Sequence, residues 1–198
     1  PFAGDDNADA NPALFVARGL PDEAPPPGSG AFVQVIGESG AGKSTHVHRW
    51  RSRAPGPLHY IPLVPYRRRW RRPPLNPIVY GDEIDRMPGP QRWRWFRLLA
   101  RHGATLVIGS HVDLSDLARK AGFGRDGCEL STFQLPAIDR AALDAMLDAR
   151  IVAAAIDDTV EPAALLTDAD RKRILDRSAG SIRHAETIGH ELIAARVR

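Results

Sequence analysis

Cysteine is nearly absent from the 198-residue sequence, since Cys128 is the only one. A single cysteine excludes an internal disulfide and any zinc site built from several cysteines. We interpret Cys128 as a small apolar residue near a strand. This sparse usage fits a reducing, cytoplasmic environment.

Long hydrophobic runs are missing as well. No stretch approaches the roughly 18 consecutive apolar residues that a helix needs to cross a bilayer, and no basic and then apolar leader opens the chain. We therefore expect a soluble, cytoplasmic protein with no membrane partner. The apolar content of 43% is enough for one substantial core, or for a core with a small appended subdomain.

Lysine is scarce, because only three of the 27 basic residues are lysine: Lys43, Lys120 and Lys172. The net charge of +3 is unevenly spread along the chain. Segment 49–101 contains 13 arginines and three acids, which gives it a charge of +10 and leaves −7 for the remainder. This clustering marks the segment as a candidate interaction surface.

The elements of an α/β core can be placed after an N-terminal arm and Pro-rich loop at residues 1–30. The apolar, β-branched run at 31–36 is typical of a buried strand. In the helix expected at 91–102, Trp95, Leu98, Leu99 and His102 share one face. Further strands are expected at 58–63, 78–81, 105–110 and 129–135, and further helices at 44–53 and 114–121.

The pattern changes near Leu135, beyond which we expect no strand. Asp139, Thr167 and Ser181 can each cap one helix, and the second of these helices would end at Gly180. We therefore predict an α/β nucleotide-binding core over residues 31–135 and a helical lid subdomain over residues 136–198.

The most informative motif directly follows the first strand. Residues 37–45 have the sequence GESGAGKST, which satisfies the pattern G-x-x-x-x-G-K-[ST]. Glycines let backbone N–H groups surround phosphate oxygens, and the following helix points its positive end at them. We expect Lys43 to contact the β- and γ-phosphates and Ser44 to bind Mg²⁺. The predicted nucleotide-binding residues are Gly37, Glu38, Ser39, Gly40, Ala41, Gly42, Lys43, Ser44 and Thr45.

Two carboxylates follow the strand expected at 78–81. We expect Asp82 to hold Mg²⁺ through water, and Glu83 to orient and deprotonate an attacking water. Binding alone needs only the aspartate, so the adjacent glutamate favours hydrolysis. The alternative is that Glu83 opens a solvated loop. Asp85 and Arg86 are interpreted as loop or helix-capping residues.

A polar residue leaving the strand at 105–110 would lie near the γ-phosphate. Ser110 and His111 are both candidates for this sensor position. One of the two can instead serve only to turn the chain.

Four segments together resemble the AAA+ ATPases: GESGAGKST, IVYGDEIDRM, LVIGSH and a helical tail containing GSIRHAE. The spacing of LPAIDRAALDAMLDARI and ILDRSAGSIRHAE is most similar to the branch of origin-recognition ATPases, transposition regulators and related bacterial ATPases. The resemblance implies a three-layer α/β P-loop core with a parallel sheet, a small C-terminal helical lid, and ATP with Mg²⁺ as ligands.

In that branch a G-x-x-R sequence at the start of the third lid helix supplies a sensor arginine. Gly180, Ser181, Ile182 and Arg183 match it, so the resemblance implies that Arg183 contacts the γ-phosphate and belongs to the nucleotide site. The alternative is a surface arginine in the first turn of a helix, where the helix dipole does not favour its charge.

The chain departs from the family in three places. Segment 63–77 leaves little room for the usual helix between the second and third strands. The second strand offers only Tyr60 and its neighbour His59 as a polar switch residue. No clear arginine finger precedes the last core strand, where Arg119 and Arg125 are the candidates. These departures bear on ring assembly and fast turnover rather than on nucleotide binding.

All four tryptophans lie in the basic segment 49–101: Trp50, Trp70, Trp93 and Trp95. Arginine neutralises phosphates and tryptophan can stack on bases, so the segment suits nucleic acid. The alternatives are a protein partner or self-association into a homo-oligomer, and a solvated surface whose tryptophans pack into the core.

The leading prediction is a Mg²⁺-dependent ATPase of AAA+ type that binds ATP and ADP and acts as a molecular switch on DNA or on a protein complex. One alternative is a P-loop kinase of a small acceptor. Another is a nucleotide-dependent binding module with little turnover.

Overall fold

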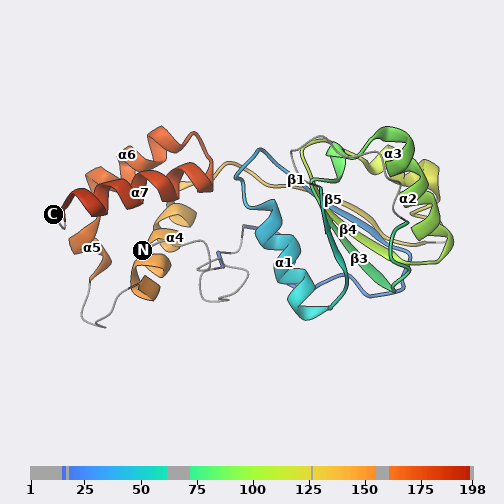
Figure 1. Cartoon of the computed structure of the whole chain (residues 1–198). Coiled ribbons are helices and arrows are strands. Elements are labelled where there is room, and N and C mark those ends of the chain that lie inside the picture. Colours follow the sequence, from blue (N-terminus) through green and yellow to red (C-terminus); the bar gives the residue numbers. More distant parts are fainter. Residues whose placement is uncertain (1–14, 17, 62–71, 126, 155–160, 197–198) are drawn as a thin grey trace. The chain divides into compact units, whose positions relative to one another are not determined.

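The computed structural model describes residues 15–16, 18–61, 72–125, 127–154 and 161–196 (Figure 1). The predicted arm at 1–12 and the position of Trp70 lie outside the described residues. The chain divides into two compact units. We call Leu20–Gly37 with His46–Leu135 the sheet unit. The helical unit comprises the described residues of Pro1–Gly19, Glu38–Thr45 and Pro136–Arg198, and therefore includes most of the phosphate-loop motif.

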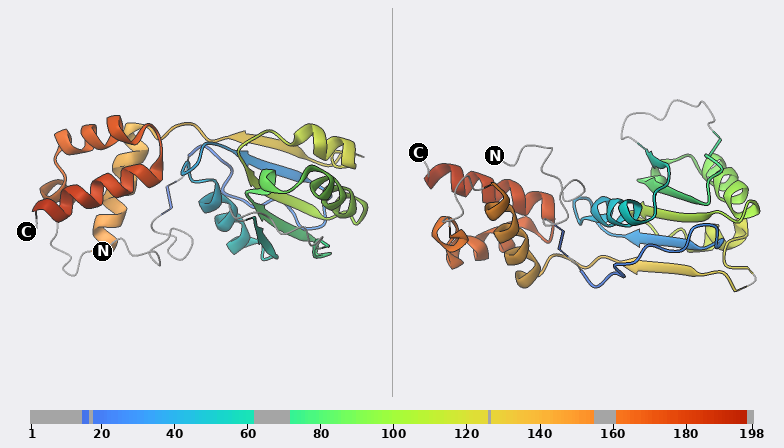
Figure 2. Two further views of the ribbon diagram at one scale, coloured as in Figure 1. Left: turned by 45° about the horizontal axis from the view of Figure 1, so that its top comes forward. Right: turned by 90° about the horizontal axis from the view of Figure 1, so that it is seen from below.

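A five-stranded parallel sheet forms the centre of the sheet unit, and the right-hand view of Figure 2 shows its strands side by side. The strands are β1 (Phe32–Ile36), β2 (Leu58–Tyr60), β3 (Ile78–Asp82), β4 (Thr105–Ser110) and β5 (Leu130–Gln134), in the order β2-β3-β4-β1-β5. Every residue of β1, β3 and β4 is buried. Burial on both faces is typical of parallel strands, and it explains why these segments are nearly continuous apolar runs.

Helices cover both faces of the sheet (Figure 1). They are α1 (Lys43–Arg53), α2 (Gly89–Arg101), α3 (Ser115–Ala121) and the short 3₁₀ helix η2 (Ile84–Arg86). On one face, the ring of Phe32 packs 5.6 Å from that of Phe96 in α2. On the other, the hydroxyl of Tyr80 donates to the Ala54 carbonyl just beyond α1, at 2.7 Å. The predicted three-layer α/β fold with a parallel sheet is therefore confirmed.

The buried face of α2 differs from the prediction. Gln91, Trp95, Phe96 and Leu99 are buried, whereas His102 is exposed. The helix ends at Arg101, and the His102 N–H donates to the Leu98 and Leu99 carbonyls as the chain leaves the last turn. His102 is thus a cap residue, which removes its side chain from the helical periodicity.

The helical unit has its own core. Its helices are α4 (Arg140–Ala154), α5 (Pro162–Leu165), α6 (Asp168–Ser178) and α7 (Ile182–Arg196). The three predicted caps are confirmed: Asp139 accepts from the Ala142 N–H at 2.7 Å, Thr167 forms a capping box with Asp170, and the Ser181 hydroxyl accepts from the His184 N–H at 3.4 Å. The core residues are Ile138, Leu143, Met146, Leu147, Ile151, Leu166, Ile174, Ala185 and Ile188.

The one-turn helix α5 was not predicted, because four residues are too few to show a helical period. Among the described residues, no helix has the length and apolar character that a bilayer span requires.

Candidate functional site

The segment GESGAGKST joins β1 to α1 and turns tightly. Gly40 and Gly42 have φ angles of 79° and 97°, a region that glycine occupies without steric cost. Between the two glycines, the Ala41 N–H donates to the Glu38 carbonyl at 3.1 Å. Glycine at positions 40 and 42 is therefore favoured by the backbone conformation of the loop itself.

Lys43 begins α1 and is only 3% exposed. Its Nζ donates to the Glu38 carbonyl at 3.0 Å, so the ammonium group lies against its own loop. Ser44 is the second residue of the same 11-residue helix. Both side chains therefore stand at the positive end of a helix that follows a glycine-rich turn, an arrangement suited to anions.

Within the helical unit, the loop packs against the start of α7. The Ile182 N–H donates to the Gly40 carbonyl at 3.0 Å. A Cβ at Gly40 would lie 2.5 Å from the Ser181 Oγ and 3.1 Å from the Arg183 Cβ. The predicted G-x-x-R sequence therefore begins α7 directly beside the loop, and the Arg183 side chain is exposed there.

Arg18 contacts the same loop and was missed by the sequence analysis. Its guanidinium donates to the carbonyls of Ala41 and Pro136. Burial lowers the pKa of Arg18, and the nearby Asp139 carboxylate opposes that shift. No motif marks this position, since a lone arginine in a segment without periodicity has no distinguishing pattern.

In the sheet unit, three strand ends meet at one edge of the sheet. Ile36 is paired in register with Ser110, and Asp82 with Gly109. Asp82 is 3% exposed, and its Oδ1 accepts from the Glu83 N–H at 3.0 Å. Because ligands of open α/β sheets bind at the carboxyl ends of the strands, this edge is where nucleotide chemistry is expected.

Glu83 has a strained backbone and a paired side chain. Its φ of 58° places it in the left-handed region, which costs a non-glycine residue on the order of 1 kcal/mol or more and is common at functional sites. Its Oε2 lies 3.0 Å from Arg86 Nη2 and 3.2 Å from His111 Nδ1. The carboxylate is only 12% exposed, which argues against the alternative of a solvated loop.

The two sensor candidates have different surroundings. Ser110 is fully buried, and its hydroxyl donates to the Val112 carbonyl at 2.8 Å, which is the geometry of a turn residue. The His111 Nδ1 lies 3.1 Å from Asp85 Oδ2 as well as beside Glu83. His111 is thus the candidate whose side chain contacts the predicted hydrolytic residue. Asp85 and Arg86, interpreted above as loop or capping residues, contact His111 and Glu83 respectively.

The end of β2 offers little to this site. Tyr60 is 57% exposed, and the His59 ring packs edge-on against Trp95 with centroids 4.7 Å apart. Of the two arginine-finger candidates, Arg119 is ion-paired with Asp116 within its own helix, at 2.6 Å.

Each unit by itself carries donors of the kinds that bind a magnesium nucleotide. Backbone N–H groups of a positive-φ glycine loop and the ammonium of Lys43 suit phosphates. The hydroxyl of Ser44 and the buried carboxylate of Asp82 are oxygen ligands, which Mg²⁺ prefers. A second group, formed by Glu83, Asp85 and His111, has ligand atoms within 4.8 Å of one another, but the Arg86 guanidinium already contacts that group.

No family model matches the chain, and no curated protein does. Among solved structures, it is similar to a point variant of Thermotoga maritima RuvB, an AAA+ P-loop ATPase, with a TM-score of 0.56 and 19% identity over 80% of this chain and 53% of that one. It is also similar to the Thermotoga maritima RuvB Holliday junction branch migration motor, with a TM-score of 0.53, 20% identity and the same coverages.

The chain therefore spans about half the length of these structures. At such identity the likeness concerns the fold alone, an α/β core with a parallel sheet that is followed by helices. The narrower resemblance to the origin-recognition and transposition-regulator branch stays a prediction.

Proposed function

We propose, from the fold that this chain shares with RuvB, that it binds ATP with Mg²⁺, hydrolyses it and acts as a molecular switch. The observation that carries the proposal is the edge of the sheet where β1 leads into the glycine loop and β3 ends in Asp82 and Glu83. A phosphate loop, together with a neighbouring strand that ends in an Asp-Glu pair, would supply the phosphate, metal and water contacts that hydrolysis of a triphosphate uses.

Binding would rest on the loop and the start of α1. When bound, MgATP supplies an electrophilic phosphorus and a metal ion that offsets phosphate charge. Lys43 would neutralise phosphate oxygens, while Ser44 and, through water, Asp82 would hold the metal. Residues 37–45 would surround the phosphates with backbone donors.

Hydrolysis would depend on Glu83. Its carboxylate would accept a proton from the attacking water and orient that water. Arg86 and His111, whose side-chain nitrogens lie 3.0 Å and 3.2 Å from its Oε2, would set the direction of the carboxylate. His111 would be the sensor residue, in preference to Ser110, because Ser110 is bonded within its turn.

The switch would use the contact between the loop and α7. The hydrogen bond from Ile182 to Gly40 joins the phosphate loop to the helix that carries Arg183. A change of phosphate occupancy would therefore bias the helical unit through Arg183 and Arg18. The proposed partners are nucleic acid or a protein complex, through the basic segment 49–101, and further copies of the chain.

Steady-state hydrolysis of ATP by the wild type and by Glu83→Gln tests the proposal. We expect Mg²⁺-dependent phosphate release that falls at least about a hundredfold in the variant, the size typical for loss of a general base. Glu23→Gln, which alters an exposed carboxylate of the sheet unit, should behave as the wild type.

Two results would contradict the proposal. Equal inactivity of the wild type and Glu83→Gln, with ATP still bound, would leave a nucleotide-dependent binding module. Transfer of the phosphoryl group to a small acceptor, in place of phosphate release, would indicate a kinase.

A further inference from the structure

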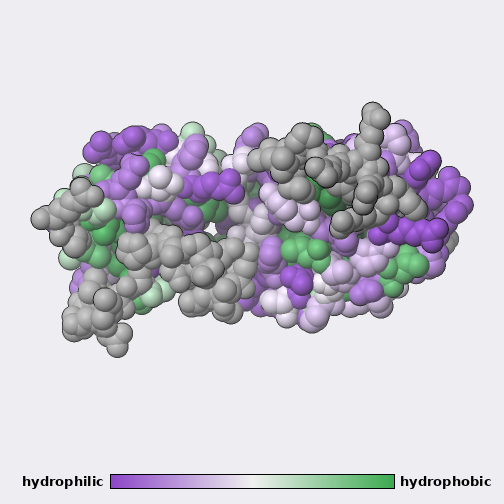
Figure 3. All heavy atoms as spheres, viewed as in Figure 1, coloured by the Kyte–Doolittle hydropathy of each residue, from purple (hydrophilic) through white to green (hydrophobic). Residues whose placement is uncertain are grey.

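A basic surface lies along α2, at the edge of the sheet opposite to Asp82 and Ser110. Two adjacent hollows of about 530 and 440 Å³ share Arg97 and Arg101 in their walls. Among the described residues that line the two hollows there is no aspartate or glutamate. We call the cationic side chains lining them the basic surface: Arg72, Arg94, Arg97, Arg101, Lys120 and Arg125. Hydrophilic residues gather over α2 and α3 in Figure 3.

Three arginines on α2 carry most of this charge. Arg94, Arg97 and Arg101 are exposed, and their side chains form no ion pair or hydrogen bond with another residue in the described part of the chain. They follow one another at spacings of three and four residues, so they share one helix face over roughly 10 Å. The helix sequence, GPQRWRWFRLLAR, contains no acid that could neutralise them.

Helix electrostatics do not account for this arrangement. A cation in the last turn of a helix is stabilised by the helix dipole, which explains Arg101. Arg94 and Arg97 lie further from the C-terminus, and their charges repel one another and that of Arg101. An uncompensated row of this kind indicates an anionic partner.

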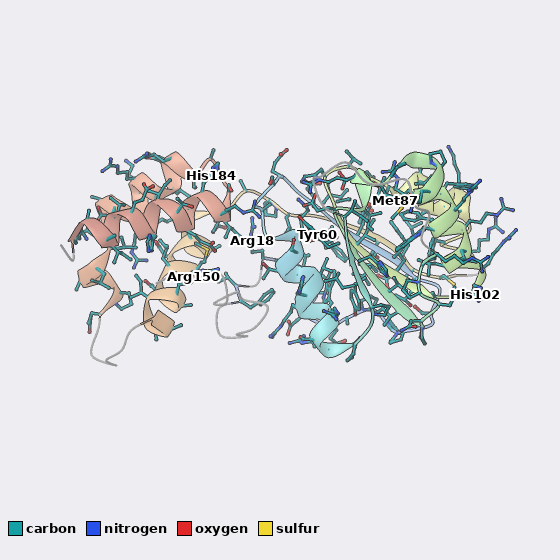
Figure 4. All side chains as sticks on the ribbon, viewed as in Figure 1. Arg18, Tyr60, Met87, His102, Arg150 and His184 are labelled. Carbon is teal, nitrogen blue, oxygen red and sulfur yellow. The ribbon has the colours of Figure 1, made fainter. Side chains whose placement is uncertain are left out.

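The basic surface lies at the amino edge of the sheet. The larger of the two hollows is lined by Gly28 to Gly30, just before β1, and by Gly103, just before β4. Figure 4 labels His102 at this end of α2. Asp82 and Ser110 lie at the opposite, carboxyl edge of the sheet. The two edges are about 17–20 Å apart, because each strand is five or six residues long. An anion held here is therefore distinct from the nucleotide phosphates.

The described aromatic side chains bear on whether the basic surface suits single-stranded or duplex nucleic acid. Trp50 and Trp95 are each 2% exposed, and Trp93 packs against the hydrophobic core. Trp50 and Trp95 therefore pack into the core, as the alternative predicted, and are not available to stack on bases, whereas Trp93 is partly buried. Among the residues that the structure describes, the basic surface has no exposed tryptophan, tyrosine or phenylalanine that could serve as the stacking platform of a single-strand binder, and its guanidinium groups suit the phosphates of a duplex.

We propose that the basic surface binds the phosphate backbone of a nucleic-acid duplex. The proposal deepens the nucleic-acid partner of the proposed function and rests on that part of it, but it does not depend on ATP hydrolysis. Each guanidinium would contact backbone phosphates and carry no base specificity.

The test measures binding of a fluorescent, mixed-sequence DNA duplex by anisotropy without nucleotide, between about 50 and 200 mM salt. We expect wild-type affinity to fall steeply with salt. Arg97→Glu/Arg101→Glu should bind at least about tenfold more weakly, and its log–log salt slope should be shallower by about two, because two phosphate contacts are lost.

Arg173→Glu/Arg177→Glu is the matched control, because it reverses two exposed arginines on α6. We expect the control to change affinity less than about threefold, apart from the general effect of net charge. Equal losses in both variants, salt-insensitive binding, or binding of polyglutamate but not of the duplex would overturn the proposal.

ATP hydrolysis measured without DNA separates this proposal from the previous one. Arg97→Glu/Arg101→Glu should hydrolyse ATP as the wild type does and melt at the same temperature. If the wild type binds the duplex and does not hydrolyse ATP, the proposed ATPase function fails and the duplex proposal stands.

Discussion

The helical unit and α2 of the sheet unit use arginine in opposite ways. In the helical unit, Arg140 lies 2.6 Å from Asp144, and Arg150 lies 2.6 Å from Glu186. Arg171, with 8% of its side chain exposed, contacts Asp144 and Asp148. On α2, by contrast, Arg94, Arg97 and Arg101 have no acid beside them.

The difference shows that the neighbours of an arginine, rather than its frequency, indicate its role. In α4, acids recur at helical spacing, so the arginines that reach them form ion-pair networks that hold the helices together. In α2, Arg92 donates to the Asp85 carbonyl, but Arg94, Arg97 and Arg101 face outward without a side-chain partner among the described residues, and their charge is left for another molecule. The two units also divide the proposed chemistry, since one carries most of the phosphate loop and the other the Asp-Glu pair.

Lys43→Ala should give the largest effect, a loss of ATP affinity, and it tests whether the phosphate loop of the helical unit binds the nucleotide. Removing one charge-assisted contact of about 1.5–3 kcal/mol should weaken ATP binding by about 10- to 100-fold. Titration with a fluorescent ATP analogue measures the affinity, with Lys172→Ala, an exposed lysine on α6, as the control. Unchanged ATP affinity in Lys43→Ala would show that the loop does not hold the phosphates.

Arg171→Met and Arg97→Met compare the two kinds of arginine directly. Arg171→Met should lower the free energy of unfolding by about 1–2 kcal/mol, because it removes the buried cation that contacts Asp148, shares Asp144 with Arg140 and donates to the Leu166 carbonyl. Arg97→Met should change it by less than about 0.5 kcal/mol, as expected of an exposed site. Urea unfolding measures both, and equal effects would break the comparison.

Gly40→Ala should disturb the joint between the loop and α7. Its positive φ and the 2.5 Å approach of the Ser181 Oγ to the added Cβ should cost about 1–3 kcal/mol. Gly89→Ala, where an added Cβ meets nothing within 4 Å, is the matched control. Hydrogen exchange at the Ile182 amide should speed up only in Gly40→Ala, and unchanged exchange would contradict the described contact.

Thr167→Ala should give the smallest effect. Loss of this N-cap should cost about 1 kcal/mol. The Thr167 hydroxyl is also the main cause of the lowered pKa of Asp170, with further contributions from the Thr167 backbone and Arg196. A lowered folded-state pKa contributes stability above the ordinary value of 3.8, and that stability is lost as pH falls through the lowered value.

The free energy of unfolding, measured as a function of pH in the acid range, tests this last effect. Urea unfolding of Thr167→Ala should show a weaker loss of stability below pH 3.8 than the wild type shows. Parallel pH profiles for the two proteins would contradict the role of the hydroxyl.

Much of the fold was predictable from local pattern. The strand at Thr105–Ser110 matches its predicted bounds, because a strand buried on both faces is a continuous apolar run. The helices beginning after Asp139 and Thr167 follow from side chains that cap them. Such signals lie within a few residues of the feature that they indicate.

The rest depends on contacts between distant segments. The contacts of Arg18 with Ala41 and Pro136 join segments 23 and 118 residues apart, and the pairing of Glu83 with His111 joins the ends of two strands. The exposure of His102 follows from where α2 ends. None of these can be deduced from spacing along the chain.

A single-turnover experiment with protein in excess over γ-labelled ATP and Mg²⁺ tests the central claim most directly. The wild type should convert bound ATP to ADP and free phosphate, while Glu83→Gln should bind as much ATP and keep it intact. Phosphate release at the same rate from Glu83→Gln, or intact ATP on both proteins, would contradict the account.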